Sequence, residues 1–544
     1  MKRITRILLA LLSGLLLAAA WPTNGFTPLI FVALVPLIFL QDYIGSQQVE
    51  TQRQQVVNKR GSVFGLSFIT FLVWNSLTTW WVWNSTPAGA VAMLLINSTL
   101  MAFFFWMYHF ARKSVFKNKN GFFLLILSFL AFEYLHYNWQ LNWPWLTLGN
   151  VFSHHHTWIQ WYEFTGVAGG TIWVLLANIL AYKFIKSTSQ RLSYLIIFFA
   201  VVLVPIIISK VMYNSYEEVG TEVEVVVVQP NIDPWNEEFS LSTSEILERN
   251  FRVAEPLITD KTRFVVSPES SIHENIWLER IDRYYSIREL KLFSQMNNIT
   301  YIIGASTLGM TTDKDDFAAR KFYDADEYFY SYNSALSIND TSDIQIHQKS
   351  RLTPGVEMMP SWWFLRPIKN LAIDLGGTVG TLKSEDKATV FTYKDAETQR
   401  LGDSVTQNYK VAPLICYESV FGDYVTEFVR NGANMIFVIT NDGWWGNTPG
   451  HRQHFEMSKL RAIENRRSIA RSANTGISGF INQRGDVVEQ TNYWEPAALC
   501  NIVNVNDEMT FYSKHGDYLY RVGTFVAILV LCFSVVTSVL KKKV

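Results

Sequence analysis

The chain has 544 residues and carries 47 Lys plus Arg against 47 Asp plus Glu, so its formal net charge is zero. This balance gives no electrostatic reason to expect a nucleic acid as partner. Charged residues make up only 17% of the chain, below the roughly 25% that is typical of soluble domains. Charged residues are sparse before residue 213, whereas residues 214–520 have the composition of a globular domain. We therefore expect a membrane part and a water-exposed part.

Eight apolar stretches have about the length that a helix needs to cross a bilayer. They lie at residues 4–20, 27–42, 62–82, 90–111, 121–138, 166–184, 193–212 and 521–540. The segments between them alternate in charge: one set carries clustered Lys and Arg, whereas "WPTNGFTP", "VWNSTPAGA" and residues 139–165 contain none. Because loops rich in Lys and Arg stay in the cytoplasm, both termini are expected there. The long segment before the last stretch then faces the periplasm of a bacterial inner membrane.

The N-terminal sequence "MKRITRILLALLSGLLLAAAW" also fits a signal peptide, because a basic start is followed by an apolar run and small residues. Trp21 after the alanines and the adjacent second apolar stretch favour a retained helix, and cleavage would leave the later orientation unchanged. The sequence predicts three parts. They are a membrane domain of seven helices at 1–213, a periplasmic domain at 214–520, and a closing transmembrane helix with a basic tail at 521–544.

Within the water-exposed part, residues 221–512 alternate strand and helix patterns. Apolar runs rich in β-branched residues are typical of buried strands, and they include "TEVEVVVVQPNI", "ITYIIGAST", "YSYNSALSI" and "ANMIFVITNDGWW". Helical patterns cover residues 281–297 and 451–470. Strands that alternate with helices predict a layered α/β domain.

Polar or reactive side chains follow three of these strands. Glu269 ends "TRFVVSPES", Lys349 and Glu357 lie in "HQKSRLTPGVEMMP", and Cys416 ends the apolar part of "YKVAPLICYES". Strand ends converge at one edge of an α/β fold, where sites form. A free cysteine is more often a buried core residue. A structural alternative for Glu357 is that it only pairs with Arg351 or Lys349.

These motifs resemble the nitrilase (carbon–nitrogen hydrolase) superfamily, whose Glu-Lys-Cys triad sits on an αββα sandwich. "KSRLTPGVEMMP" keeps the spacing K-x-x-L-x-P-x-x-E-x-x-P, and "NDGWWGNTPGHRQHFEMSKLRAIENRRSIARSANTGISGFI" follows a second family motif. The apolar stretches around this domain, with "PWLTLGN" and "IQWYEFTGVAGG", resemble the membrane-bound branch formed by the apolipoprotein N-acyltransferases. Two departures are Ser267, where tryptophan is usual, and a polar insert at about residues 370–410.

The resemblance implies that Glu269, Lys349 and Cys416 are catalytic. Cys416 would take an acyl chain from a phospholipid as a thioester and pass it to the α-amino group of a diacylglyceryl-apolipoprotein at the lipid bilayer. Supporting or substrate-binding roles fall, by the same resemblance, to Glu357, Tyr417, Glu418 and Trp235. Trp362 and Trp363 in "PSWWFLRP" are candidates for a lid that enters the membrane interface.

The chemistry places a demand on the site. A thiol with a pKa near ~8.5 and a carboxyl group near ~4.3 differ by about 4 units, which costs roughly 5–6 kcal/mol in water. Burial must raise the pKa of the glutamate, while Lys349 stabilises the anions. An amidase tethered to the membrane and acting on a soluble C–N bond is the alternative function, and a non-catalytic scaffold is a third. No metal cluster or phosphate-binding glycine loop is evident, so the sequence predicts no cofactor.

Overall fold

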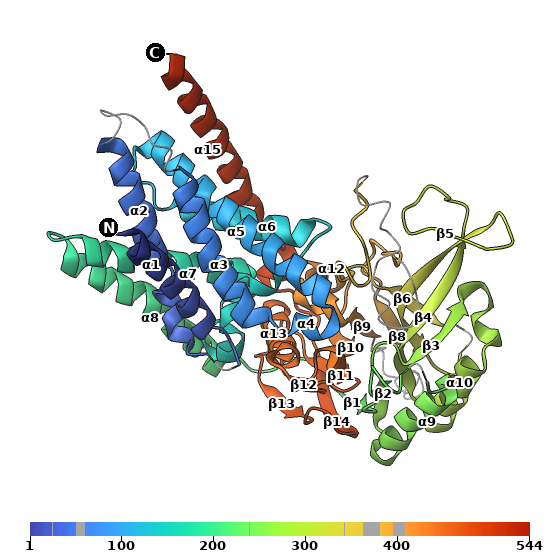
Figure 1. Ribbon diagram of the computed structural model, residues 1–544. Helices are drawn as coiled ribbons and strands as arrows, with labels where there is room; N and C mark the ends of the chain where they lie inside the picture. Colours follow the sequence, from blue (N-terminus) through green and yellow to red (C-terminus); the bar gives the residue numbers. More distant parts are fainter. Residues whose placement is uncertain are drawn as a thin grey trace. The chain divides into compact units, whose positions relative to one another are not determined.

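The computed structural model describes residues 1–23, 25–50, 60–238, 240–341, 343–362, 381–394 and 408–543. The chain forms two compact units (Figure 1). The helical unit comprises Met1–Trp83, Pro87–Ser215 and Asp517–Val544. The α/β unit comprises Asn84–Thr86 and Tyr216–Gly516.

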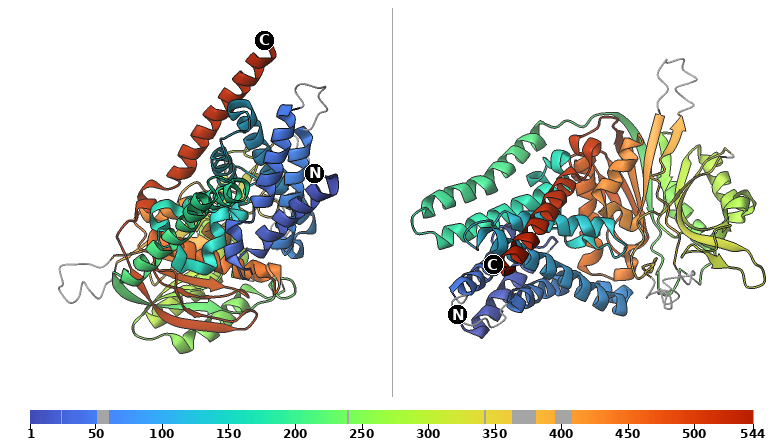
Figure 2. Two further views of the ribbon diagram at one scale, coloured as in Figure 1. Left: turned by 90° about the vertical axis from the view of Figure 1, so that its left-hand side faces the viewer. Right: turned by 90° about the horizontal axis from the view of Figure 1, so that it is seen from above.

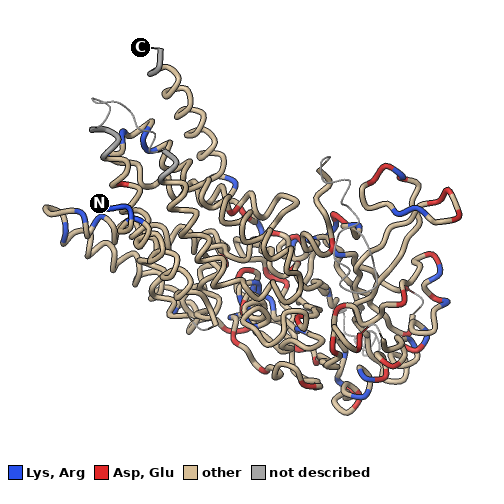
Figure 3. The backbone as a smooth tube through the Cα atoms, viewed as in Figure 1, with Lys and Arg blue, Asp and Glu red and all other residues tan. Residues whose placement is uncertain are grey.

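The helical unit is a bundle of apolar helices along which charged residues are sparse (Figure 3). Its long helices are α1 (Arg3–Ala19), α2 (Val35–Glu50), α3 (Arg60–Thr79), α5 (Pro87–Phe116), α6 (Leu124–Asn138), α7 (Tyr162–Lys186), α8 (Arg191–Ser215) and α15 (Tyr518–Lys543). Helix therefore occurs in every predicted apolar stretch. Among the described residues, 5 stretches are long and apolar enough to cross a membrane: Thr27–Ser46, Pro87–Phe116, Tyr162–Lys186, Arg191–Ser215 and Tyr518–Leu540. The full number of spans stays a prediction.

A buried carboxylate links three helices of the helical unit. Glu133 of α6 accepts hydrogen bonds from the N–H of Leu148 at 2.8 Å and from the hydroxyl of Thr171 on α7 at 2.7 Å. The hydroxyl of Tyr520 on α15 donates to the same carboxylate at 2.9 Å. Polar groups that are shielded from water need partners of this kind, so Glu133 helps to fix the last helix against the bundle.

The α/β unit contains two sheets that pack face to face (Figure 2). The first has the strand order β14-β1-β2-β4-β6-β5, with β3 on β4 and β7 on β6, and the second has the order β13-β12-β11-β10-β9-β8. The strands of the first sheet are β1 (Thr221–Gln229), β2 (Thr262–Val266), β3 (Ile272–Trp277), β4 (Thr300–Thr311), β5 (Arg320–Lys321), β6 (Tyr328–Ile338), β7 (Gln345–Gln348) and β14 (Ala497–Val505). Those of the second are β8 (Phe391–Lys394), β9 (Asn408–Ile415), β10 (Met435–Thr440), β11 (Ile469–Ala473), β12 (Gly479–Ile481) and β13 (Val487–Gln490).

Strand β1 shows how the layers form. Val225 and Val227 point into the core between the two sheets, while Val226 and Val228 pack beneath α9 (Thr243–Ala254) and α10 (Tyr285–Asn297). Alternate side chains of a strand face opposite sides, so a valine run can fill both cores. On the second sheet, α12 (Gly422–Arg430) packs on β9 and α13 (Pro449–Asn465) on β12. The unit is an αββα sandwich, which confirms the predicted fold class.

One predicted helix is too long. The helical pattern at 451–470 corresponds to α13, which ends at Asn465 because Arg466 adopts the left-handed conformation with φ of 49°. Helices often end at such a residue, but it is usually glycine, and the arginine gave no signal of the end. Strand β11 then begins at Ile469, which places Arg471 on a central strand of the second sheet.

Candidate active site

Cys416 lies where β9 ends and the short 3-10 turn η8 (Cys416–Val420) begins. Its φ of 49° is in the left-handed region, which costs a residue other than glycine of order 1–3 kcal/mol. Hydrogen bonds hold this conformation, because the carbonyl oxygen of Cys416 accepts from the Ser419 hydroxyl at 2.7 Å and from Nε2 of His454 at 3.2 Å. A nucleophile on a sharp turn after a strand is presented at the sheet edge.

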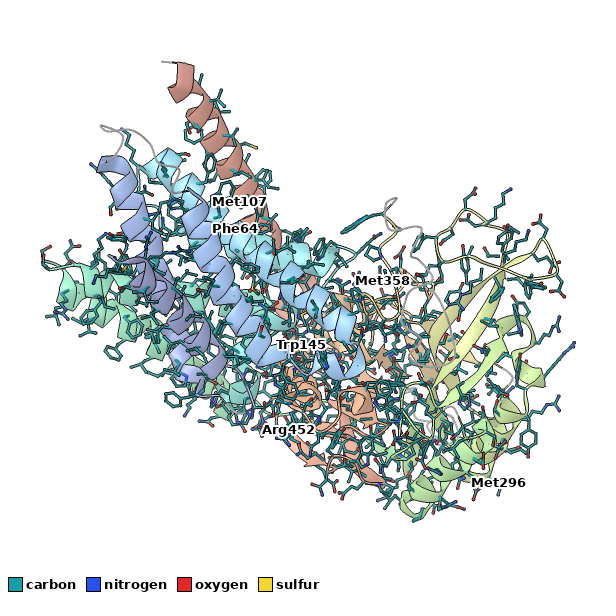
Figure 4. All side chains as sticks on the ribbon, viewed as in Figure 1. Phe64, Met107, Trp145, Met296, Met358 and Arg452 are labelled. Atoms are coloured by element: carbon teal, nitrogen blue, oxygen red, sulfur yellow. The ribbon has the colours of Figure 1, made fainter. Side chains whose placement is uncertain are left out.

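Lys349 bridges two glutamates. Its Nζ donates to Oε1 of Glu269 at 2.9 Å and to Oε1 of Glu357 at 2.8 Å, and its side chain is only 2% exposed. Asn333 on β6 donates to the same two oxygens at 2.7 Å and 3.0 Å. The carbonyl oxygen of Asn333 also accepts from the N–H of Lys349 at 2.8 Å. One cation and one amide thus fix both carboxylates; Met358 marks the loop of Glu357 in Figure 4.

Glu269 is placed by a close approach of two segments. It follows β2, and β4 passes so near that a Cβ at Gly304 would lie 2.6 Å from the Cα of Glu269. Glycine at this point lets the strand meet the backbone of the glutamate. Ser267, which stands where the superfamily usually has tryptophan, contacts Oδ1 of Asn250 at 3.0 Å and the hydroxyl of Tyr301 at 2.7 Å. That departure from the family pattern is therefore accommodated by buried polar contacts.

The end of β10 meets both the thiol and the base. The side chain of Thr440 acts to lower the pKa of the Cys416 thiol, and the N–H of Asn441 donates to Oε2 of Glu269 at 3.2 Å. The charges of Glu269 and Lys349 both act on the thiol. The structure thus brings together the three segments that carry Glu269, Lys349 and Cys416.

Burial raises the pKa of the Cys416 thiol well above its usual value, and the negative charge of Glu269 acts in the same direction. Lys349 opposes this rise. Burial lowers the pKa of Lys349 itself, but the charges of Glu269 and Glu357 outweigh that effect and hold its pKa well above the usual range. The resting site therefore contains a neutral thiol and an ammonium ion, and a thiolate forms only when a base takes the proton.

Glu418 connects the turn after β9 to the segment after β7. Its Oε2 accepts from the N–H of Ile415 at 2.8 Å, and its Oε1 accepts from the N–H of Ser350 at 2.7 Å. Nε2 of His347 lies 3.1 Å from Oε2. Burial raises the pKa of Glu418, but His347 and the two N–H groups outweigh burial and keep its pKa lowered. Ile415 and Ser350 adjoin the nucleophile and the lysine, so this enclosed carboxylate holds the two segments in register.

Three further side chains pack behind Cys416. Nδ1 of His454 lies 2.8 Å from Oδ1 of Asp442, and Arg471 donates to Oδ2 of Asp442 at 2.7 Å. Sγ of Cys416, a carboxylate oxygen of Asp442 and a ring nitrogen of His454 lie within 4.8 Å of one another. These atoms are potential metal ligands, but the guanidinium of Arg471 already neutralises the carboxylate and opposes a second cation. We assign the group to hydrogen bonding that supports the nucleophile turn.

The remaining predicted residues have varied surroundings. Trp235 is 51% exposed, and its ring lies edge-on to Trp444 with 4.8 Å between centroids. Tyr417 is buried beside Cys416. Trp362 is half-buried, and Trp363 lies outside the described residues, so the lid stays a prediction. Of the insert at 370–410, Phe391–Lys394 forms β8 at the edge of the second sheet.

Sequence reasoning did not single out Asn333, Asn441 or Glu238. Asn441 belongs to the quoted "NDGWW" motif, and Asn333 is an amide within a strand whose neighbours are largely buried. Both could have been noticed in the sequence, because a polar side chain within or directly after a strand that is predicted to be buried needs a partner. Glu238 follows β1 in an irregular loop and gave no signal.

The fold and this cluster define a class: nitrilase-type proteins, in which a cysteine at a strand end meets a lysine and glutamates on an αββα sandwich. Residues 225–507 match the family model "Carbon-nitrogen hydrolase", and residues 13–180 match "Apolipoprotein N-acyltransferase N-terminal domain". The chain belongs to the carbon–nitrogen hydrolase family.

Its relatives cover both units. Apolipoprotein N-acyltransferase of Chlorobaculum tepidum is 26% identical over 538 residues, which are 95% of this chain and 94% of the relative. The proteins of the same name from Geobacter metallireducens and Rickettsia prowazekii are 25% and 27% identical, over 94% and 97% of this chain and 91% and 97% of their own lengths. Together with the apolar helices, these relatives identify a membrane-associated enzyme.

Proposed function

We propose that this protein transfers an acyl chain from a membrane phospholipid, through a thioester on Cys416, to the α-amino group of the N-terminal diacylglyceryl-cysteine of an apolipoprotein. The observation that carries the proposal is a cysteine, lysine and glutamate cluster in a chain that also forms a bundle of apolar helices. Similarity to apolipoprotein N-acyltransferases over both parts of the chain supports it. An acyl donor that diffuses in the bilayer explains why the enzyme needs the helices.

In the first half of the reaction, Glu269 takes the thiol proton and the thiolate attacks the ester carbonyl carbon. A C–S bond forms, the ester C–O bond breaks, and Glu269 returns the proton to the leaving oxygen, which releases a lysophospholipid. Glu269 is preferred to Glu357 as the base because it exerts the largest charge effect on the thiol. Deprotonating a thiol of raised pKa requires a base near it.

Lys349 is suited to stabilise the oxyanion of the tetrahedral intermediate. An ammonium group has three N–H donors, and two of those of Lys349 are held by Glu269 and Glu357. Among the described residues the third has no acceptor, so it is available to the developing negative charge, together with backbone N–H groups beside Cys416. The two carboxylates keep the ammonium charged in spite of its burial.

In the second half, the acceptor amine attacks the thioester carbonyl carbon. The C–N bond forms, Glu269 takes a proton from the nitrogen, and the sulfur leaves and receives that proton as the thiol. Water competes with the amine, but a bound and oriented amine acts with an effective concentration of about 10⁵ M or more. A positioned acceptor therefore makes the enzyme a transferase.

Incubating the full-length protein with phospholipid that carries a labelled acyl chain tests the proposal. We expect a protein-bound label that hydroxylamine releases, because a thioester is sensitive to hydroxylamine. Cys416→Ala should carry no label. An unlabelled wild-type protein that is folded and hydrolyses small soluble amides would instead support the amidase.

The charge pattern of the helical unit further supports a bacterial inner membrane location, with both termini cytoplasmic and the α/β unit in the periplasm. A protease site inserted at Tyr323, in an exposed loop of the α/β unit, measures this orientation. We expect cleavage in intact spheroplasts, while a tag at the C-terminus becomes accessible only after the membrane is permeabilised. The reverse pattern would refute a periplasmic site.

A further inference from the structure

A second buried acid lies beside Glu269 and has no part in the steps above. Glu238 is 4% exposed, and its Oε2 accepts a hydrogen bond from the side-chain amide of Asn441 at 2.9 Å. Within the described part of the chain, its other oxygen has no hydrogen-bond partner. Enclosing a carboxyl group in a protein is unfavourable for folding, so the presence of one here calls for a role.

Asn441 ties this acid to the proposed base. Its side chain serves Glu238, while its backbone N–H donates to Oε2 of Glu269 at 3.2 Å. Two carboxyl groups bound by one asparagine lie close together. Burial raises the pKa of Glu238 to about 8, the negative charge of Glu269 adds to that rise, and the Asn441 hydrogen bond opposes it. Glu238 is therefore largely protonated at neutral pH, and a positive charge placed beside it would favour release of that proton.

The loop of Glu238 lies on the turn after β10. A Cβ at Gly443 would come within 3.0 Å of the ring of Pro234, and the ring of Trp235 contacts Trp444. Trp235 remains 51% exposed. One short loop thus offers an exposed apolar surface and, three positions later, a buried acid. An acceptor with acyl chains and an amino group needs both kinds of contact.

The acceptor brings a proton that the ester donor does not. An α-amino group has a pKa of about 7.7–8.0 and is largely an ammonium ion at neutral pH, which cannot attack a carbonyl carbon. In the second half-reaction, Glu269 accepts the proton that the nitrogen loses on attack. The ammonium ion carries one proton more than the free amine. A second base is therefore needed to remove that proton before the nitrogen attacks.

We propose that Glu238 binds the α-ammonium group of the acceptor and takes its first proton, which leaves the free amine to attack the thioester. This assignment rests on the proposed function. An N–H bond breaks and an O–H bond forms on Glu238, and that proton passes to solvent at the end of the cycle. On binding, the positive charge of the ammonium group favours the ionised form of Glu238, whose resting proton leaves to solvent. Because the two groups have similar pKa values, a proton of the ammonium then passes readily to the carboxylate beside it.

The test measures the two half-reactions separately in the full-length protein with labelled phospholipid. Glu238→Gln keeps an oxygen for Asn441 but accepts no proton. Glu237→Gln is the matched control, since this neighbouring glutamate pairs with Arg249 at 3.2 Å on the surface. We expect Glu238→Gln to form the acyl-enzyme at the wild-type rate and to transfer the chain to a diacylglyceryl-cysteine peptide about 10-fold more slowly at pH 7, where about a tenth of the amine is unprotonated without help. Glu237→Gln should leave both steps unchanged.

Hydroxylamine separates proton transfer from a structural role, because it is largely unprotonated at neutral pH and has no first proton to lose. A structural defect would slow its reaction as much as that of the peptide. Glu238→Gln should transfer the acyl chain to hydroxylamine as fast as the wild type does. Its transfer to the peptide should recover as the pH rises past about 8, where the ammonium loses its proton unaided. Equal slowing with both acceptors, or peptide transfer like that of Glu237→Gln, would overturn the assignment.

If Glu238→Gln does not fold, it will not form the acyl-enzyme in the first half-reaction. In that case Glu238→Asp replaces it, and we expect slower peptide transfer with normal acyl-enzyme formation and normal transfer to hydroxylamine. Equal loss in every step would again refute the role. An unlabelled wild-type protein, by contrast, contradicts the proposed function as a whole.

Discussion

Replacing Glu269 by glutamine is expected to slow acyl-enzyme formation by about 10²- to 10⁴-fold, because the Cys416 proton then has no acceptor. The variant should fold, since the amide oxygen of glutamine can still accept from Lys349 and Asn333, which contact Oε1 of Glu269 at 2.9 Å and 2.7 Å. The initial rate of labelling by phospholipid measures the effect. It isolates the first half-reaction from any change in acceptor binding.

Glu357→Gln is the matched control for that variant. Glu357 bonds the same two partners, at 2.8 Å to Lys349 and 3.0 Å to Asn333, so both substitutions disturb the same cluster. The thiol, however, feels the charge of Glu269 more than any other. We therefore expect a clearly smaller loss for Glu357→Gln. Equal losses would show that the two acids act together, and a larger loss for Glu357→Gln would reverse the assignment of the base.

Replacing Lys349 by methionine is expected to abolish labelling and to lower the free energy of unfolding of the α/β unit by about 3–5 kcal/mol. Labelling is lost because the variant lacks the donor proposed for the oxyanion. Stability falls because two buried carboxylates would face each other without the cation that now bonds each of them. Breaking a buried ion pair on one side leaves an uncompensated charge that water cannot reach. Thermal or denaturant unfolding, followed beside the labelling assay, measures the loss.

Lys383→Met provides the comparison for a lysine outside the site. Lys383 pairs with Asp316, and its side chain is 32% exposed against 2% for Lys349. Exposed ion pairs contribute about 0–1 kcal/mol, so this variant should unfold almost like the wild type and keep its label. Labelling of Lys349→Met at the rate of Lys383→Met would contradict the role of Lys349 in stabilising the oxyanion.

The nucleophile turn shows what a sequence motif can predict and what it cannot. "ICYES" placed Cys416 after an apolar strand, and the structure has β9 end at Ile415. The motif could not show that Cys416 has a positive φ, or that Ser419 and His454 hold its carbonyl oxygen. Backbone strain of this kind depends on partners from another helix. Likewise, the arginine that ends α13 carries none of the usual signals for the end of a helix.

The sequence by itself determined the two-part organisation, the buried strands and the residue types of the site, because hydropathy, strand periodicity and charge in a loop are local properties of the chain. Only the tertiary structure decided which groups are partners. Asn333 reaches Glu269 across 64 positions and Asn441 reaches it across 172, while Glu238 meets Asn441 across 203. Such contacts depend on how strands of two sheets align at one edge, and that alignment is set by the packing of the whole αββα core.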